Sequence, residues 1–313
     1  MLEGKRVAVV VPAYDEERLV AQTIHGIPGF VDRILVVDDA SRDGTAAAAE
    51  SIGDPRVAVL RHERNRGVGA AIATGYRRAL EEEIDVTCVM AADNQMDPAE
   101  LEGIAAPVAR GEVEYAKANR LVTGEAWTVI PRTRYLGNAV LSLLTKIASG
   151  YWHVADSQAG YTAISLAALG RLDLPRLYPR YGFPNDLLVH LNVQSARVRD
   201  VPSRPIYHVG ERSGIRLRSV VPRISWLLFK GFWWRLGHKY VIRDFHPLVF
   251  FYVFGVLMTL AGFLLGVVEL VLRIAGNEIT TPTIVLVAVL LIAGLQLTLF
   301  AMWFDQEANK DLR

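Results

Sequence analysis

Apolar positions in the first part of the chain occur in short continuous runs, and each run is followed by polar residues and then by a segment with helical spacing. The runs lie at residues 6–12, 33–38, 57–60 and 86–90. Continuous runs of this length are typical of strands that are buried on both faces of a parallel sheet. Because helical segments such as residues 16–24 separate them, the pattern predicts βαβ units and an α/β fold with a mostly parallel sheet.

The chain is organised around the stretch at residues 85–98, which reads DVTCVMAADNQMDP. It begins as a buried strand that contains Cys88, the only cysteine, so an internal disulfide is excluded. It then turns polar. Asp93 and the amide oxygen of Gln95 are hard oxygen donors two residues apart, and in an extended chain they face the same side, so we predict that they hold Mg²⁺ or Mn²⁺. The alternative is a polar strand-to-helix turn that Asp97 caps.

Acidic side chains follow the ends of three predicted strands. Loops at one edge of a parallel sheet converge, so these carboxylates are expected to line one crevice. Carboxylates there can accept hydrogen bonds from a nucleoside and can hold a metal that neutralises a diphosphate. Asp15 is also expected to cap the helix at residues 16–24. The acids are Asp15, Glu16, Asp38, Asp39 and Asp93.

Two long apolar segments dominate the end of the chain. Residues 247–268 carry no charge over 22 residues, and residues 282–304 carry none over 23. Each is long enough to cross a hydrocarbon core of ~30 Å as a helix, so the sequence predicts two transmembrane helices. By the positive-inside rule, the basic residues before the first span predict that the N-terminal domain and the C-terminus are cytoplasmic.

Charge is distributed unevenly along the 313 residues, although the net charge is only +1. Residues 197–243 hold eleven Lys or Arg and two acids, a net charge of +9, so the remainder carries −8. Aromatic side chains are interspersed among these cations, and the first span follows directly. This combination predicts helices that lie in the headgroup layer of a membrane. Nucleic-acid binding is the competing interpretation, and the adjacent spans argue against it.

Three arginines lie close together in the middle of the chain, at Arg120, Arg132 and Arg134. Arginine binds phosphate through paired donors, so these guanidiniums are candidates for a phosphate site. The alternative is that they are solvated surface arginines. Farther along, Asp156 and Asp186 are single acids, and a helix N-cap is the alternative role for each of them.

Four motifs occur here in the order found in family-two glycosyltransferases with the GT-A fold: PAYDEE, DDASRDGT, NRGVGAA and ADNQMDP. Downstream, KANRL, PRTRYLGN, DSQAGY and GFPNDLL resemble the polyprenyl-phosphate branch of that family. This branch contains dolichol-phosphate mannose synthases and bacterial relatives with two C-terminal membrane helices. The resemblance covers residues 5 to about 205.

The resemblance implies roles for particular residues. Asp93 and Gln95 would hold the metal, Asp186 stands where the wider family places a catalytic base, and Asp156 is expected in the site without a fixed role. The family usually has an acid two residues before Asp93, and here Ala91 replaces it. The donor nucleotide would be held by Pro12, Ala13, Tyr14, Glu16, Asp39 and Asp93. The acceptor phosphate would be held by Arg120, Arg134 and Asn138, with Arg132 as a further candidate.

These features together predict a metal-dependent inverting glycosyltransferase that moves a hexose from a GDP- or UDP-linked donor to a polyprenyl phosphate at the cytoplasmic membrane face. The expected division is a GT-A domain at residues 1–210, interfacial helices at 211–245, and a transmembrane hairpin with a short cytoplasmic tail at 246–313. Two alternatives stay open: a membrane glycosyltransferase that extends a sugar hydroxyl, and a non-catalytic membrane-anchored subunit that binds nucleotide-sugars. A homo-oligomer is also compatible with the sequence.

Overall fold

The computed structural model of the protein describes residues 1–122, 132–206, 217–278 and 280–313. These residues form two compact units. The first comprises residues 1–233 together with 311–313, and the second comprises residues 234–310. The three-part division expected from the sequence stays a prediction.

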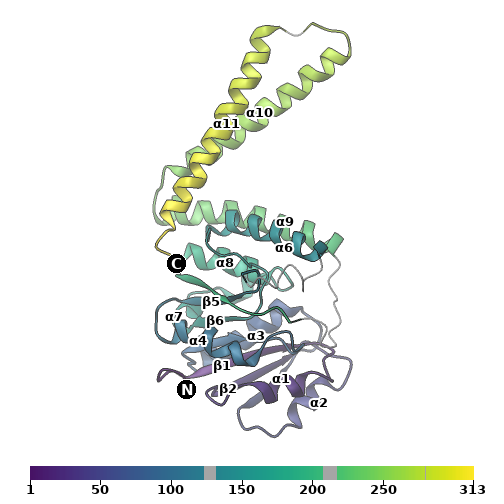
Figure 1. Cartoon of the computed structure of the whole chain (residues 1–313), viewed down its shortest axis with the longest axis vertical. Coiled ribbons are helices and arrows are strands. Elements are labelled where there is room, and N and C mark those ends of the chain that lie inside the picture. The colour runs from purple at the N-terminus through teal and green to yellow at the C-terminus, as the bar shows by residue number, and fades with distance from the viewer. Residues whose placement is uncertain (123–131, 207–216, 279) are drawn as a thin grey trace. The chain divides into compact units, whose positions relative to one another are not determined.

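A seven-stranded sheet with the order β3-β2-β1-β4-β6-β5-β7 forms the centre of the first unit (Figure 1). Strands β1 to β4 are parallel, β6 runs antiparallel to both of its neighbours, and β7 is parallel to β5. The predicted α/β fold with a mostly parallel sheet is therefore confirmed. The strands are β1 (Val7–Ala13), β2 (Arg33–Asp38), β3 (Val57–Arg61), β4 (Val86–Val89), β5 (Tyr115–Asn119), β6 (Thr162–Ser165) and β7 (Val198–Pro202).

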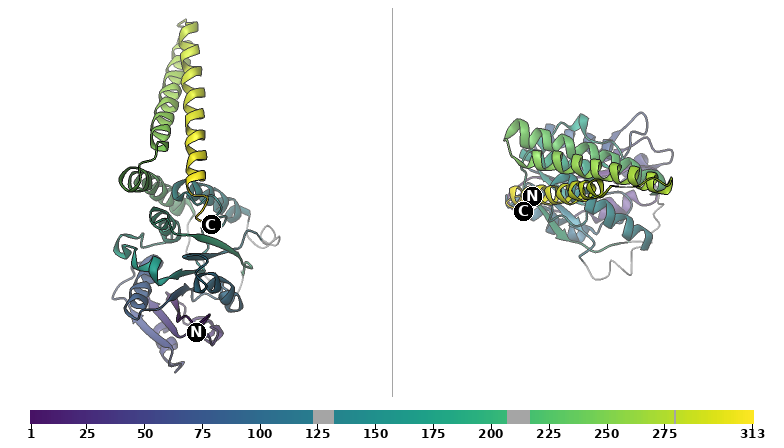
Figure 2. Two further views of the ribbon diagram at one scale, coloured as in Figure 1. Left: turned by 90° about the vertical axis from the view of Figure 1, so that its left-hand side faces the viewer. Right: turned by 90° about the horizontal axis from the view of Figure 1, so that it is seen from above.

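Helices cover both faces of this sheet (Figures 1 and 2). The α-helices of the first unit are α1 (Val20–Gly26), α2 (Thr45–Glu50), α3 (Val68–Glu81), α4 (Leu101–Ala109), α6 (Arg132–Ser149), α7 (Leu166–Gly170), α8 (Phe183–Val193) and most of α9 (Leu217–Gly237). Short 3₁₀ turns occur at η1 (Pro98–Glu100) and η2 (Leu174–Arg176).

Strand β1 explains why the apolar runs are continuous. All seven of its residues are buried. Val9 packs into the hydrophobic cluster that contains α1 and α4, whereas Val10 packs into the cluster that contains α3 and α8. Both faces of the strand are thus covered. Gly75 of α3 permits close approach here, because a Cβ at that position would lie 2.3 Å from Cγ1 of Val10.

Two capping expectations had different outcomes. Asp97 does cap the turn after β4, because its Oδ1 accepts a hydrogen bond from the Ala99 backbone N at 2.9 Å. The expectation that Asp15 caps the first helix is wrong. Asp15 adopts a left-handed backbone with φ of 56°, and its carboxylate accepts from the Arg42 backbone N at 2.7 Å. The chain must leave this turn before α1 can begin at Val20.

The last residues of the chain belong to the first unit. The carbonyl oxygen of Leu312 accepts a hydrogen bond from the backbone N of Val198, on the edge strand β7, at 3.0 Å. The Leu312 side chain packs against the hydrophobic cluster that contains α3 and α8. The C-terminal tail therefore returns to the sheet after α11.

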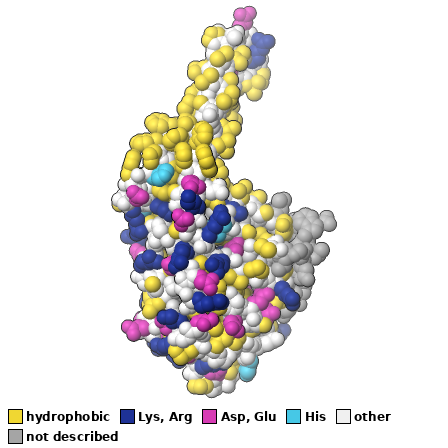
Figure 3. All heavy atoms as spheres, turned by 60° about the vertical axis from the view of Figure 1, so that its left-hand side comes forward, with side chains coloured by type: hydrophobic (Ala, Val, Ile, Leu, Met, Phe, Trp, Pro, Cys, Tyr) yellow, Lys and Arg dark blue, Asp and Glu magenta, His cyan; other side chains and the backbone are white. Residues whose placement is uncertain are grey.

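The second unit contains two long apolar helices, α10 (Leu248–Ile274) and α11 (Thr281–Ala308), which lie side by side (Figures 1 and 2). Both are long and apolar enough to cross a membrane. Their outward side chains are mostly hydrophobic (Figure 3). Small residues let the helices approach closely, since a Cβ on Gly255 would lie 2.6 Å from Oγ1 of Thr298.

A buried ion pair ties the end of α11 to the segment that precedes α10. Arg235 donates two hydrogen bonds to the Asp305 carboxylate, at 2.8 and 2.9 Å, and both side chains are fully buried. The hydroxyl of Tyr240, in the π-helical segment η3 (His238–Arg243), donates to Asp305 at 2.7 Å. Asn309 donates in turn to the Tyr240 hydroxyl at 2.7 Å.

Candidate active site

A cavity of about 250 Å³ opens at the carboxyl ends of β1 and β4. One part of its wall is polar, formed by Asp93, Gln95, Arg120, Asn138 and Gln158. Another part is apolar and includes side chains from α3, α6, α8 and α9. These are Val68, Ile72, Leu141, Phe183, Val220, Val221 and Ile224. The fold thus brings five predicted site residues, Pro12 among them, into one cavity with an apolar side.

The predicted metal ligands lie on the loop that follows β4. The backbone N of Gln95 donates to Oδ1 of Asp93 at 3.1 Å, and Asn94 between them has a φ of 57°. Both side chains line the cavity, as does Ala91. Among the residues that the structure describes, no group of three or more His, Cys, Asp or Glu side chains could hold a metal by itself. The oxygens of Asp93 and Gln95 fit a hard cation whose remaining ligands are water and substrate phosphates.

Glu16 adds negative charge to this part of the molecule. Burial, together with the charges of Asp93, Asp43 and Asp15, raises the pKa of Glu16 to about 7. Burial makes the largest contribution to this shift, and the neighbouring carboxylates add negative potential to it. Such a potential favours a bound cation.

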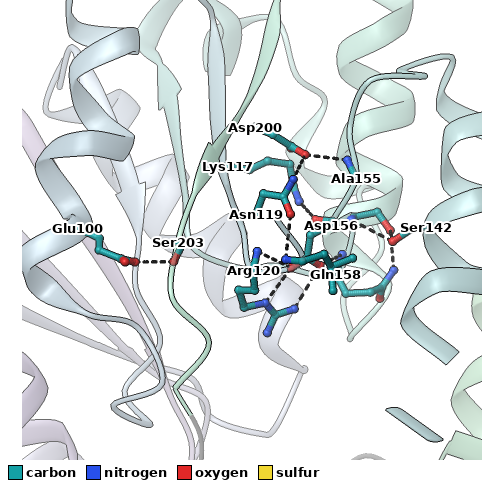
Figure 4. Close-up of polar contacts among 12 residues, drawn as sticks. Glu100, Lys117, Asn119, Arg120, Ser142, Ala155, Asp156, Gln158, Asp200 and Ser203 are labelled. Atoms are coloured by element: carbon teal, nitrogen blue, oxygen red, sulfur yellow. Dashed lines mark hydrogen bonds and ion pairs between the residues drawn. The ribbon is translucent and has the colours of Figure 1, made fainter. Parts of the chain in front are cut away.

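Arg120 reaches the cavity while a buried carboxylate holds it from behind (Figure 4). Its Nε donates to Oδ2 of Asp156 at 2.8 Å, and its Nη2 donates to Oδ1 at 3.2 Å. Lys117, which is fully buried, donates through Nζ to the backbone oxygen of Asp156. Burial alone would raise the pKa of Asp156, but the Arg120 guanidinium outweighs it and holds that pKa below its usual range.

Asp156 therefore lies in the site as an ionised partner of Arg120. It is not among the residues that line the cavity. The segment before it is anchored to the edge strand, because Asp200 of β7 accepts from the Ala155 backbone N at 2.7 Å and from Nδ2 of Asn119 at 2.8 Å. The contacts of Asp156 with Arg120 differ from those of a helix N-cap, which was the alternative role predicted for it.

Asp186 has a different environment. It lies in the first turn of α8, and its Oδ2 accepts from the Tyr178 backbone N at 2.8 Å and lies 3.9 Å from Nε2 of His190. Burial raises its pKa, although His190 opposes the shift. Asp186 is not among the residues that line the cavity. Its place among the catalytic residues stays a prediction.

The other predicted donor residues lie around β1 and β2. Ala13 is buried at the end of β1, and Tyr14 is exposed. Asp39 is buried and accepts three hydrogen bonds, from the backbone N of Arg66 at 2.8 Å, the backbone N of Gly67 at 2.7 Å and Nδ1 of His62 at 2.7 Å. Asp39 thus orders the turn before α3. Its predicted contact with the nucleotide stays a prediction.

Two predicted acceptor residues fall partly outside the described part of the chain. Arg132 and Arg134 lie in the first turn of α6, but their side chains are outside the described residues. Asn138, one turn farther along this helix, lines the cavity.

Sequence reasoning missed a buried polar cluster behind the cavity. Its members are Ser142 and Thr145 of α6, Ser157 of the segment before β6, and Asn185 of α8, and Ser157 links the cluster to Gln158 on the cavity wall. The signal was present in the motifs DSQAGY and GFPNDLL, where uncharged polar residues stand beside the acids. Roles were predicted for the acids Asp156 and Asp186 of these motifs, and no role was predicted for the polar side chains beside them.

Solved structures establish the fold independently. The crystal structure of glucosyl-3-phosphoglycerate synthase from Mycobacterium tuberculosis, in complex with Mn²⁺, UDP and glucosyl-3-phosphoglycerate, matches with a TM-score of 0.56. The match covers 75% of this chain and 81% of that one, at 20% sequence identity.

Three curated relatives have names that refer to a dolichyl, undecaprenyl or polyprenol lipid. A UDP-N-acetylglucosamine–dolichyl-phosphate N-acetylglucosaminyltransferase from Methanococcus voltae is 28% identical over 221 residues, which cover 66% of this chain and 88% of that protein. An undecaprenyl-phosphate mannosyltransferase from Micrococcus luteus is 31% identical, covering 63% and 82%. A polyprenol monophosphomannose synthase from Mycolicibacterium smegmatis is 28% identical, covering 71% and 86%.

The family model for glycosyl transferase family 2 matches residues 8–172. This range contains strands β2 to β6, all but the first residue of β1, the loop that carries Asp93 and Gln95, and the Arg120–Asp156 pair. The match therefore spans both the sheet and the polar wall of the cavity, and the chain belongs to glycosyl transferase family 2.

Proposed function

We propose that this glycosyltransferase transfers a hexose from a nucleoside diphosphate to a polyprenyl phosphate, with inversion at the anomeric carbon. The observation that carries the proposal is the cavity, whose polar wall contains Arg120 and Asn138 and whose apolar wall includes side chains of α9. A polyprenyl phosphate has a doubly charged head and an apolar tail, so it matches both walls. The named relatives act on acceptors of this chemical class.

The acceptor phosphate needs to be held rather than deprotonated. Phosphomonoesters have a second pKa near ~6, so the attacking oxygen is already anionic at pH 7. Arg120 and Asn138 hold and orient this phosphate beside the donor. Its oxygen forms a bond to C1 of the sugar from the side opposite the diphosphate, while the bond from C1 to the diphosphate oxygen breaks and the nucleoside diphosphate leaves with the electron pair.

The donor diphosphate lies at the other end of the polar wall in this proposal. Asp93 and Gln95 would hold Mg²⁺ or Mn²⁺, which when bound supplies positive charge for the departing diphosphate. Asp156 keeps Arg120 aimed at the cavity through its bidentate contact. The apolar walls exclude water, which would otherwise compete with the acceptor for the sugar.

We also propose that the second unit anchors the enzyme in the cytoplasmic membrane as a two-helix hairpin. The backbone contact between Leu312 and Val198 supports this topology, because it requires the C-terminus and the sheet to be on the same side of the membrane. Basic residues before α10 favour the cytoplasmic side. A cysteine at Asn277 should react with an impermeant reagent added to intact cells, and a cysteine at Lys310 should not. The reverse labelling would contradict the topology.

The function is tested with purified full-length protein, a panel of labelled UDP- and GDP-sugars, a polyprenyl phosphate and Mg²⁺ or Mn²⁺. We expect label from one donor to enter the organic phase after extraction. Arg176→Ala, which changes an exposed arginine on a 3₁₀ turn, is the control and should behave as wild type. Label that appears only in water-soluble glycosides, or no turnover of any donor, would contradict the proposal.

A further inference from the structure

Three consecutive side chains, at residues 156–158, are engaged in three different places. Asp156 pairs with Arg120 (Figure 4), Ser157 belongs to the buried polar cluster behind the cavity, and Gln158 lines the cavity itself. The backbone is fixed at this point, because the Gln158 N donates to Oδ1 of Asp156 at 3.2 Å and the Ser157 N donates to Oγ of Ser142 at 3.3 Å. Gln158 therefore projects from a rigid support.

Ser157 determines which way the Gln158 amide is turned. The Ser157 hydroxyl oxygen accepts from Nδ2 of Asn185 at 3.3 Å and from Nε2 of Gln158 at 2.8 Å, which occupies both of its lone pairs. Oγ of Ser157 also lies 3.2 Å from Oγ of Ser142, in a hydrogen bond for which either hydroxyl can be the donor. Asn185 is fully buried and is itself held by donation to Oγ1 of Thr145 at 2.7 Å.

This network leaves the amide oxygen of Gln158 for a ligand. Its Nε2 is committed to Ser157, and its Oε1 has no hydrogen-bond donor among the residues that the structure describes. An amide oxygen only accepts hydrogen bonds. It suits a hydroxyl group, which donates, and it repels the oxygens of a phosphate.

The position of Gln158 indicates which part of the substrate lies beside its amide oxygen. The segment that carries it packs on the loop that holds Asp93 and Gln95. A Cβ on Gly160 would lie 3.5 Å from Cε of Met96, and the Tyr161 hydroxyl donates to the backbone oxygen of Asp97 at 2.9 Å. Gln158 thus lies on the wall where the proposed function puts the donor diphosphate and its attached sugar.

We propose that Gln158 is a specificity-determining residue whose Oε1 accepts a hydrogen bond from a hydroxyl of the transferred sugar. Ser157 and Asn185 are positioning residues that fix the orientation of its amide. The inference rests on the proposed function, because it takes a nucleotide-sugar as the ligand. It adds the sugar hydroxyl as the group that Gln158 recognises.

The test compares nucleotides with and without a sugar. Full-length wild type and Gln158→Met, which keeps the side-chain length and removes the amide, are titrated calorimetrically in Mg²⁺ with UDP, GDP, UDP-N-acetylglucosamine, UDP-glucose and GDP-mannose. Loss of one neutral hydrogen bond should weaken the best nucleotide-sugar about two- to twelve-fold, with the matching nucleoside diphosphate unchanged. Gln194→Met, at the end of α8, is the matched control and should change neither.

Deoxy analogues of the preferred sugar identify the contact. One analogue, lacking the recognised hydroxyl, should bind wild type as weakly as the complete sugar binds Gln158→Met, and the variant should not distinguish the two. Ser157→Ala should show the same sugar-selective loss to a smaller extent. An equal loss for nucleotide and nucleotide-sugar, a change only in the KM for polyprenyl phosphate, or no tighter binding of any nucleotide-sugar than of its nucleotide in wild type would overturn the inference.

The two proposals fail separately. A sugar-selective loss in Gln158→Met without any polyprenyl product would sustain the role of Gln158 and contradict the acceptor. Polyprenyl product formed by Gln158→Met with an unchanged KM for the donor would sustain the acceptor and contradict the role of Gln158.

Discussion

The two units each contain an arginine that donates two hydrogen bonds to a buried carboxylate, and the two pairs have different surroundings. Arg235 and Asp305 are both fully buried, and Tyr240 adds a further donor to the carboxylate. In the Arg120–Asp156 pair only the carboxylate is fully buried, and 24% of the arginine side chain is exposed. The bidentate contact joins helices in the second unit, whereas in the first unit it presents the Arg120 guanidinium to the cavity.

The difference shows how a buried charge becomes available for binding. Removing two ions from water costs more free energy than their attraction returns unless the geometry is good. A fully buried pair such as Arg235–Asp305, called the sealed pair below, is therefore weak evidence for stability. In a pair with a partly exposed arginine, such as Arg120–Asp156, the arginine is held rigidly and can still contact an anion. This pair is called the open pair below. Two of the following predictions test whether the two pairs differ in this way, and the other two concern the acids Asp93 and Glu16.

The largest effect is expected at the carboxylate that faces the cavity. If Asp93 acts through a cation, Asp93→Asn should remove most of the activity, and chelator should do the same to wild type, because Ala91 leaves no second acid in reserve. Initial rates over a range of Mg²⁺ and Mn²⁺ concentrations measure this. Ala91→Asp should lower the metal concentration that gives half-maximal rate. Full activity in chelator would disprove the metal requirement.

Arg120→Met removes the arginine of the open pair. One charge-assisted contact to phosphate contributes about 1.5–3 kcal/mol. The rate with polyprenyl phosphate should therefore fall roughly ten- to two-hundred-fold if the contact is felt in the transition state. The KM for the donor should change little, and Arg176→Met is the control. A near-normal rate would mean that this arginine does not hold the acceptor.

Breaking the sealed pair should change stability instead of chemistry. Asp305→Leu leaves Arg235 buried without its counter-charge, a loss that typically costs about 3–5 kcal/mol. The double variant Arg235→Met/Asp305→Leu removes both charges and should recover most of that loss. Thermal melts in detergent, with rates normalised to folded protein, measure both quantities. A double variant as unstable as the single one would show that the pair contributes more than charge compensation.

The smallest effect concerns Glu16, a carboxylate near other acids. Its pKa is raised in the folded state to about 7 from an ordinary value of 4.5, so ionisation destabilises the fold as pH rises through this interval. Glu16→Gln should therefore gain thermal stability over wild type between pH 4.5 and 8 in metal-free buffer. Glu81→Gln, at an exposed position at the end of α3, should show no such trend. A constant difference across this pH range would refute the prediction.

The first four strands, the helices that separate them and the two long apolar helices could be predicted from the sequence alone, whereas strands β5, β6 and β7 were not predicted. Continuous apolar runs can be buried only between two covered faces, which made the parallel sheet predictable, and uncharged segments of 22 and 23 residues made the two long helices predictable. The motifs identified the family and drew attention to Asp93, Gln95, Arg120 and Asn138, all of which line the cavity. These conclusions depend on local pattern and composition, which a sequence records directly.

Which side chains contact one another became clear only from the folded structure. Asp156 lies 36 residues from Arg120 and pairs with it because β6 returns antiparallel beside β5. Asp15 orders a loop instead of capping a helix, and Asn185 rather than Asp186 joins the network that reaches Gln158. For each of these residues the side chain is chemically able to form more than one kind of hydrogen bond. The choice depended on partners distant in sequence, because a carboxylate or amide takes the buried donor or acceptor that the fold brings within hydrogen-bonding distance.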